Sequence, residues 1–129
     1  MVVLTIKGTV TSGYGEGRLF LNLQWVKDRL REVSGFIPYP GTLNLLVKDE
    51  ESSRALNLLR EHSGIPIEPP PGYLPGKIFK AKLGSLDCVV VIPIIDRDPD
   101  VLELVSGVNL RETLGLRDGD HLKVKVYLE

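Results

Sequence analysis

Three glycines at alternate positions, Gly13, Gly15 and Gly17, stand between a predicted strand and a predicted helix and are followed by Arg18. Glycine lets the backbone turn several N–H groups toward one point, and such nests bind phosphate oxygens. An arginine beside the nest adds a charge that can bind a phosphate through two hydrogen bonds. The spacing matches neither the Walker A nor the dinucleotide-binding motif, so a flexible turn remains the alternative to a phosphate-binding loop. The candidate residues are Gly13, Tyr14, Gly15, Glu16, Gly17 and Arg18.

Thr42 and Asn44 form a second candidate site, because residues two apart on a strand point to the same face. Their side chains would present a hydroxyl and an amide oxygen side by side. Mg²⁺ takes few protein oxygens and completes its octahedron with water and substrate phosphates. Two neutral ligands would suit an ion whose negative partners come mainly from a nucleotide. The alternative is that both side chains bond to the preceding turn.

The segment Asn109, Leu110, Arg111 and Glu112 combines an amide, a guanidinium and a carboxylate at a predicted helix start. Such groups can bind the hydrogen-bonding edge of a base, and a carboxylate accepting from an exocyclic amine is one mode of cytosine recognition. The alternative is a solvated helix face.

Asp96 and Glu103 form a fourth candidate pair. Two carboxylates could act as general acid and base, or could bind the hydroxyls of a polyol. The alternative is that they only cap turns and carry surface charge.

These residues must be positioned by a fold that alternation of apolar and polar residues predicts to be mainly β with short helices. Regular βαβ alternation is missing, so a small closed β-barrel is favoured over a doubly wound sheet. Gly8 is expected to mark a bulge or a close backbone approach, and Asp49 to cap a helix. Strands are predicted at 2–11, 42–47, 79–83, 86–95 and 122–128, helices at 22–33, 50–63, 110–114 and after Asp98-Pro99, and a rigid proline-rich surface loop at 65–76.

Length and composition limit the classes of protein. The 129 residues suit one domain spanning 1–129, and the single cysteine, Cys88, excludes an intrachain disulfide. The net charge of −1 does not favour a strongly basic nucleic-acid surface, although it does not exclude a local basic patch, and no nucleic acid partner is expected. No apolar run or signal-peptide pattern points to a membrane, so a cytoplasmic location is expected. The sequence leaves the oligomeric state open.

Taken together, these segments resemble the archaeal CTP-dependent riboflavin kinase family over nearly the whole chain. The segments that carry the resemblance are Ser12-Gly13-Tyr14-Gly15-Glu16-Gly17-Arg18 with Phe20, Pro40-Gly41-Thr42-Leu43-Asn44-Leu45, Val91-Ile92-Pro93, Leu110-Arg111-Glu112, and Leu116 with Asp118-Gly119-Asp120.

The resemblance implies a compact six-stranded barrel of the cradle-loop type. It also implies transfer of the γ-phosphate of CTP to the 5′-hydroxyl of riboflavin, giving FMN and CDP. By position, residues 13–18 and 109–112 would bind the nucleotide, Thr42 and Asn44 would hold one Mg²⁺, and Asp96 and Glu103 would lie at the flavin side. Glu16 and Asp96 are the candidates for a catalytic base, which stays unassigned. The alternative is a non-catalytic β-barrel module that senses nucleotides or flavins or binds DNA in regulation.

Overall fold

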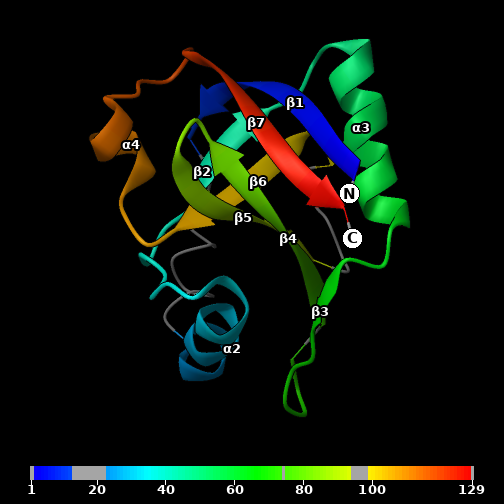
Figure 1. Ribbon diagram of the computed structural model, residues 1–129, viewed down its shortest axis with the longest axis vertical. Coiled ribbons are helices and arrows are strands. Elements are labelled where there is room, and N and C mark those ends of the chain that lie inside the picture. The colour runs from blue at the N-terminus through cyan, green and yellow to red at the C-terminus, as the bar shows by residue number, and fades with distance from the viewer. Residues whose placement is uncertain (1, 13–22, 74, 94–98, 129) are drawn as a thin grey trace.

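The computed structural model describes residues 2–12, 23–73, 75–93 and 99–128, which contain seven strands and three helices (Figure 1). The strands are β1 (Val2–Thr11), β2 (Leu43–Leu46), β3 (Ile65–Ile67), β4 (Gly76–Leu83), β5 (Leu86–Pro93), β6 (Val101–Ser106) and β7 (His121–Leu128). The helices are α2 (Gln24–Ser34), α3 (Glu50–Glu61) and α4 (Leu110–Leu114).

Six of the strands close into an antiparallel barrel, as the sequence predicted. Their order is β4-β5-β6-β2-β1-β7, and β7 returns to β4 through the pairs Ala81 with Val126 and Lys82 with Lys125. The seventh strand, β3, lies outside the barrel and pairs only with the first residues of β4. Every functional segment must therefore be placed on the outer surface or at the ends of a filled barrel.

Two apolar clusters hold the barrel and its helices together. The interior cluster takes inward residues of the barrel strands, such as Ile6, Leu45 and Leu104, and one face of α3. The second cluster lies on the outer surface of β4, β5 and β6, where Val26 and Leu30 of α2 pack. Apolar and polar residues alternate along most strands, because successive side chains point to the barrel interior and to its outer surface in turn. The helix α2 thus covers one side of the barrel and leaves the surface of β1, β2 and β7 uncovered by it.

Gly8 confirms the expected close backbone approach. A Cβ atom placed there would lie 2.7 Å from the Cβ of Leu45 on the neighbouring strand β2. Real Cβ atoms do not approach so closely, so only glycine allows β1 and β2 to pair in this register. That register sets which polar side chains of the two strands meet further along.

Two expectations about the elements are wrong. The residues after Asp98-Pro99 form the strand β6 rather than a short helix, because Leu102 and Leu104 alternate with Glu103 and pair with strands on both sides. The loop predicted at 65–76 begins with the strand β3. Pro66 is tolerated there because β3 is an edge strand that needs no donor at that position.

The remaining predicted strands and helices are confirmed wherever their residues are described, with ends shifted by at most a few positions. The carboxylate of Asp49 caps α3 by accepting the N–H of Ser52 at 2.9 Å. None of the described helices is long and apolar enough to cross a membrane.

Candidate functional site

A row of polar side chains crosses three strands on the outer surface of the barrel. In the antiparallel register, Asn44 of β2 lies opposite Thr11 of β1 on one side and Glu103 of β6 on the other. Opposite residues on antiparallel strands have Cβ atoms about 4.5–5.5 Å apart, so these three side chains are neighbours. The next residue of the row, Val91 of β5, belongs to the apolar cluster under α2. The row therefore ends at the buried apolar cluster that α2 covers.

Thr42 and Asn44 lie side by side as the sequence predicted. The hydroxyl of Thr42 donates a hydrogen bond to the Oδ1 atom of Asn44 at 3.2 Å, and both residues are half-buried. The intervening Leu43 points into the barrel, which fixes the direction of its two neighbours. Two neutral oxygen atoms are thus held together beside Glu103 before any ligand arrives.

The start of α4 is held by two hydrogen bonds from one side chain. The Oδ1 atom of Asn109 accepts the N–H of Glu112 at 3.2 Å and caps the helix, as expected for a residue at a helix start. Its Nδ2 atom donates to the hydroxyl of Tyr39 at 3.1 Å. Tyr39 is in turn fixed by its own N–H, which donates to the carbonyl of Ser106 at 2.7 Å.

Asp118 links α4 to the residue that precedes the glycine-rich segment. Its carboxylate accepts a hydrogen bond from the hydroxyl of Ser12 at 2.7 Å and one from Arg111 at 2.8 Å. The hydrogen bonds from Ser12 and Arg111 hold the pKa of Asp118 below its ordinary value. Two backbone hydrogen bonds of 2.8 Å, from Gly119 to Val10 and from Val10 to Asp120, fix this turn against the end of β1.

A pocket of about 190 Å³ brings together residues of the second and third candidate segments. Its lining includes Thr42 and Tyr39 together with Asn109, Leu110 and Arg111. Because Thr42 also touches the polar row through Asn44, the pocket connects the expected metal ligands to the expected base-binding segment. Residues about 65 positions apart in the chain thus form one site.

Several predicted site residues lie outside the described residues: Gly13, Tyr14, Gly15, Glu16, Gly17, Arg18 and Asp96. The last described residues before them, Thr11 and Ser12, both contact this site. Sequence reasoning missed Thr11 as a partner of the site, and it gave no hydrogen-bonding role to Tyr39 or to Asp118, which it named only within a family segment. The register of β1 with β2 places Thr11, the bond from Asn109 places Tyr39, and the bond from Arg111 places Asp118. These contacts join segments far apart in the chain, so no local motif could have shown them.

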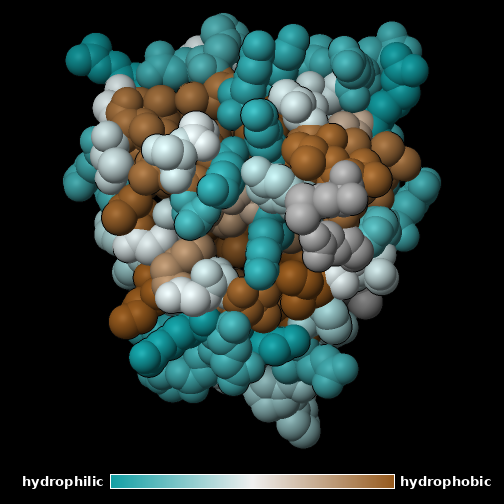
Figure 2. All heavy atoms as spheres, viewed as in Figure 1, coloured by the Kyte–Doolittle hydropathy of each residue, from teal (hydrophilic) through white to brown (hydrophobic). Residues whose placement is uncertain are grey.

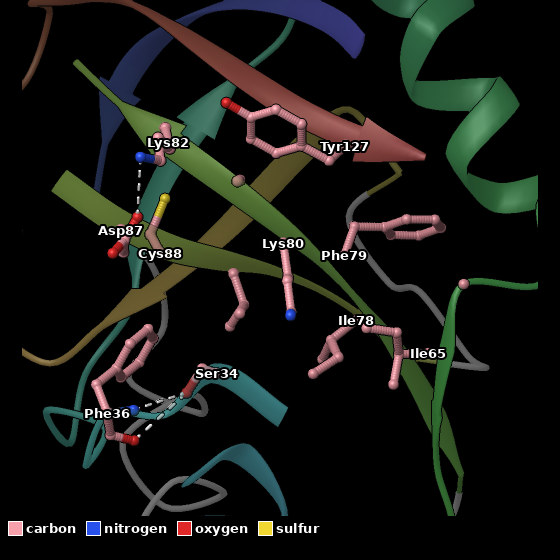
Figure 3. A pocket seen from close by; sticks show the side chains of 13 residues that line it. Ser34, Phe36, Ile65, Ile78, Phe79, Lys80, Lys82, Asp87, Cys88 and Tyr127 are labelled. Carbon is pink, nitrogen blue, oxygen red and sulfur yellow. Dashed lines mark hydrogen bonds and ion pairs between the residues drawn. The ribbon is translucent and has the colours of Figure 1, made fainter. Parts of the chain in front are cut away.

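A larger hollow of about 460 Å³ lies elsewhere, on the outer surface of β4 between β7, β3 and the end of α2 (Figure 3). None of the predicted site residues lines it. Size alone therefore does not identify the site that the sequence motifs predict.

Comparison with known proteins decides the family. The family model for CTP-dependent riboflavin kinases, which carries the description "Domain of unknown function DUF120", matches residues 10–126. The chain belongs to this family. Its members in the comparison include proteins named riboflavin kinase from three archaea. The proteins from Archaeoglobus fulgidus, Sulfolobus acidocaldarius and Sulfurisphaera tokodaii are 41%, 42% and 38% identical to this chain. The matches cover 97%, 98% and 98% of this chain.

The family members differ in length. The chain spans 55% of the Archaeoglobus protein, 83% of the Sulfolobus protein and 97% of the Sulfurisphaera protein. Membership of the CTP-dependent riboflavin kinase family confirms the resemblance and agrees with the phosphotransferase class that it implied. The matched region 10–126 includes all four candidate segments.

Proposed function

We propose that this chain transfers the γ-phosphate of CTP to the 5′-hydroxyl of riboflavin and releases FMN and CDP. The observation that carries the proposal is the position of Thr42, which lies both in the pocket with Asn109 and Arg111 and beside the polar row with Asn44 and Glu103. Family membership supplies the substrates, which the geometry does not identify by itself. Phosphoryl transfer requires mainly that two substrates are positioned and that charge is neutralised.

The donor set of Thr42 and Asn44 fits one Mg²⁺. Both ligands are neutral oxygens held 3.2 Å apart, and the described residues contain no group of three or more acidic, histidine or cysteine side chains suited to a metal. Mg²⁺ prefers oxygen, keeps several waters and takes its remaining ligands from substrate phosphates. Bound here, the ion would neutralise charge on the phosphates of CTP. The two side chains would serve to fix its position.

The two substrates would meet along the polar row. CTP would place its base near residues 109–112 and its phosphates toward Thr42 and the segment 13–18. Riboflavin combines an apolar ring with a polar chain of hydroxyls, and Glu103 is the last polar residue of the row before Val91, which is buried under α2. The carboxylate of Glu103 would accept hydrogen bonds from those hydroxyls and orient the 5′-hydroxyl, with Asp96 as the second flavin contact. We assign no catalytic base.

The test is an endpoint assay of purified protein with riboflavin, Mg²⁺ and one of CTP, ATP, GTP or UTP, in which FMN is separated by chromatography. FMN formed chiefly with CTP supports the proposal. FMN formed chiefly with ATP would refute the base-binding role of residues 109–112. No FMN with any nucleotide, from folded protein, would favour the non-catalytic module.

The metal ligands have their own test. The double variant Thr42→Ala with Asn44→Ala should lose at least about 100-fold in FMN formation, since it removes both oxygens that position the ion. Thr5→Ala, which removes an exposed strand threonine elsewhere on the barrel, is the matched control and should keep full activity. Normal turnover by the double variant would remove this metal site from the proposal.

A further inference from the structure

The outer surface of β1, β7 and β4 places lysines opposite lysines. Lys7 of β1 faces Lys123 of β7, and Lys125 of β7 faces Lys82 of β4. Lys80 lies two residues before Lys82 on the same side of its strand, and all five side chains are exposed. Like charges directly opposite on neighbouring strands are destabilising. We call Lys7, Lys80, Lys82, Lys123 and Lys125 the lysine face.

The usual structural reasons for lysines on strands do not account for this face. Lysines often protect sheet edges, but β1 pairs with β2 and β7, and β7 pairs with β1 and β4. Local acids offset only part of the charge. Asp87 pairs with Lys82 at 3.5 Å, and the pKa of Asp49 is lowered mainly by the hydrogen bond from the Ser52 N–H and only slightly by the charge of Lys7. Within the described residues, the other three lysines make no ion pair.

The lysine face therefore concentrates positive charge in a protein whose net charge is −1. The near-neutral total hides a local separation of charge. A surface that keeps such repulsion between its own residues is suited to an anionic partner, whose binding would relieve it.

A hollow with an aromatic wall lies beside these lysines. Tyr127 projects from the same side of β7 as Lys123 and Lys125, and it lines the 460 Å³ hollow together with Lys80 and Lys82. Apolar residues including Phe36 and Ile65 form other parts of the lining (Figure 3). Figure 2 shows the same face, with hydrophilic side chains running down the middle between two apolar areas.

We propose that this face binds single-stranded nucleic acid, with the lysines on successive phosphates and one base in the hollow against Tyr127. Lysine grooves with interspersed aromatic side chains bind single strands because every base has a face that can stack. Residues two apart on β7 are about 6.8 Å apart, so Lys123, Lys125 and Tyr127 form an extended track. In a duplex the bases stay stacked inside the helix, and an acidic peptide has no bases, so neither would place a base in the hollow. The proposal does not depend on the kinase activity.

The first experiment measures fluorescence anisotropy of a labelled oligouridylate of about 12 nucleotides as the full chain is added. For single strands, the logarithm of the binding constant falls with the logarithm of salt concentration by about 0.7 per phosphate contacted. Three to five contacts predict that affinity falls about 20- to 130-fold between 50 and 200 mM salt. A change below about fivefold would overturn the proposal, because it leaves room for fewer than about two contacts.

Two double variants test whether binding depends on the lysine face or only on the total positive charge of the protein. Lys123→Gln with Lys125→Gln should reduce the salt slope by about 1.4, and it should not lower the melting temperature, since it removes repulsion with Lys7 and Lys82. Arg31→Gln with Arg54→Gln removes the same charge from two exposed helix positions and should leave the slope unchanged. An equal effect of the two double variants would overturn the proposal.

The hollow is tested by Tyr127→Leu, which should weaken binding at least about fivefold at every salt concentration without changing the slope, because one stacking contact is lost. Affinity that is unchanged in this variant would overturn the role of the hollow. Competition decides the class of partner. A duplex of equal length or polyglutamate that displaces the probe as well as unlabelled oligouridylate does would also overturn the proposal, and polyglutamate would then identify an acidic protein segment as the partner.

Discussion

Asn109 allows a sharp test of how residues 109–112 take part in nucleotide binding. Both polar atoms of its side chain are already used, one to cap α4 at Glu112 and one to hold the hydroxyl of Tyr39. Each atom keeps one further hydrogen-bonding position, but the two bonds already made hold the side chain against α4 and Tyr39, so it is not free to turn toward a base. We therefore predict that Asn109 shapes the pocket and that any base contact at this position comes from the backbone.

The expected loss of stability follows from those two bonds. Asn109→Ala removes an N-cap and one exposed hydrogen bond, which together cost about 1–2 kcal/mol. The entropy of unfolding near 60 °C is about 2.1 cal/mol/K per residue, or about 0.27 kcal/mol/K for a chain of this length. The melting temperature should therefore fall by about 4–7 °C. Asn109→Asp keeps an acceptor for the N–H of Glu112 and for the hydroxyl of Tyr39, so its melting temperature should change by less than about 2 °C.

The assay compares melting temperature with the preference for CTP over ATP in FMN formation. Asn109→Asp should keep both properties, whereas Asn109→Ala should lose stability and bind CTP more weakly. If Asn109→Asp keeps its melting temperature but loses the preference for CTP, the amide itself contacts the base and the reasoning is wrong. A fall of less than about 1 °C for Asn109→Ala would instead refute the capping role.

Three further predictions test other parts of the molecule. Gly8→Ala should lower the melting temperature by about 4–11 °C, because its Cβ would lie 2.7 Å from that of Leu45 and such overpacking costs about 1–3 kcal/mol; Thr5→Ala is the control. Asp118→Asn should raise the KM for CTP more than that for riboflavin. The hydrogen bonds from Ser12 and Arg111 lower the pKa of Asp118. Asp118→Asn should therefore be less stable than wild type at pH values above the ordinary carboxyl pKa, and this difference should disappear as the pH falls through the lowered pKa of Asp118. Melting temperatures measured across this pH range test the prediction. Burial raises the pKa of Cys88 to about 12, so its alkylation at pH 8 should be at least about a thousandfold slower in native than in unfolded protein.

Much of the fold could be predicted because strand periodicity survives in the local sequence. The alternation of apolar and polar residues in β1 and β7 is clear in the amino-acid sequence. One inward apolar face per strand is enough to favour a barrel. The strand β6 was missed because Asp98-Pro99 is a strong local signal for a helix start. What overrides that signal is pairing with β2 and β5, which lie far away in the sequence.

The site was predictable in its motifs and not in its connections. Thr42 and Asn44 are two apart, so their proximity follows from strand geometry alone. The position of Asn44 between Thr11 and Glu103 depends on the register of three strands, and a shift of one residue would turn these side chains inward. The close approach at Gly8 helps to set that register. The link from Arg111 through Asp118 to Ser12 likewise depends on how a turn docks on β1.

The strand β1 carries residues of both the candidate site and the lysine face, so its geometry decides whether they influence each other. Lys7 and Thr11 lie on the same side of β1, and four residues of an antiparallel strand span about 14 Å. The Debye length is about 8 Å at physiological ionic strength and about 30 Å at 0.01 M. An anion on the lysine face would therefore be largely screened from a nucleotide at Thr42 and Asn44 in physiological salt, and would repel it in dilute buffer. The two proposed anion-binding surfaces of this barrel would thus act independently under physiological conditions.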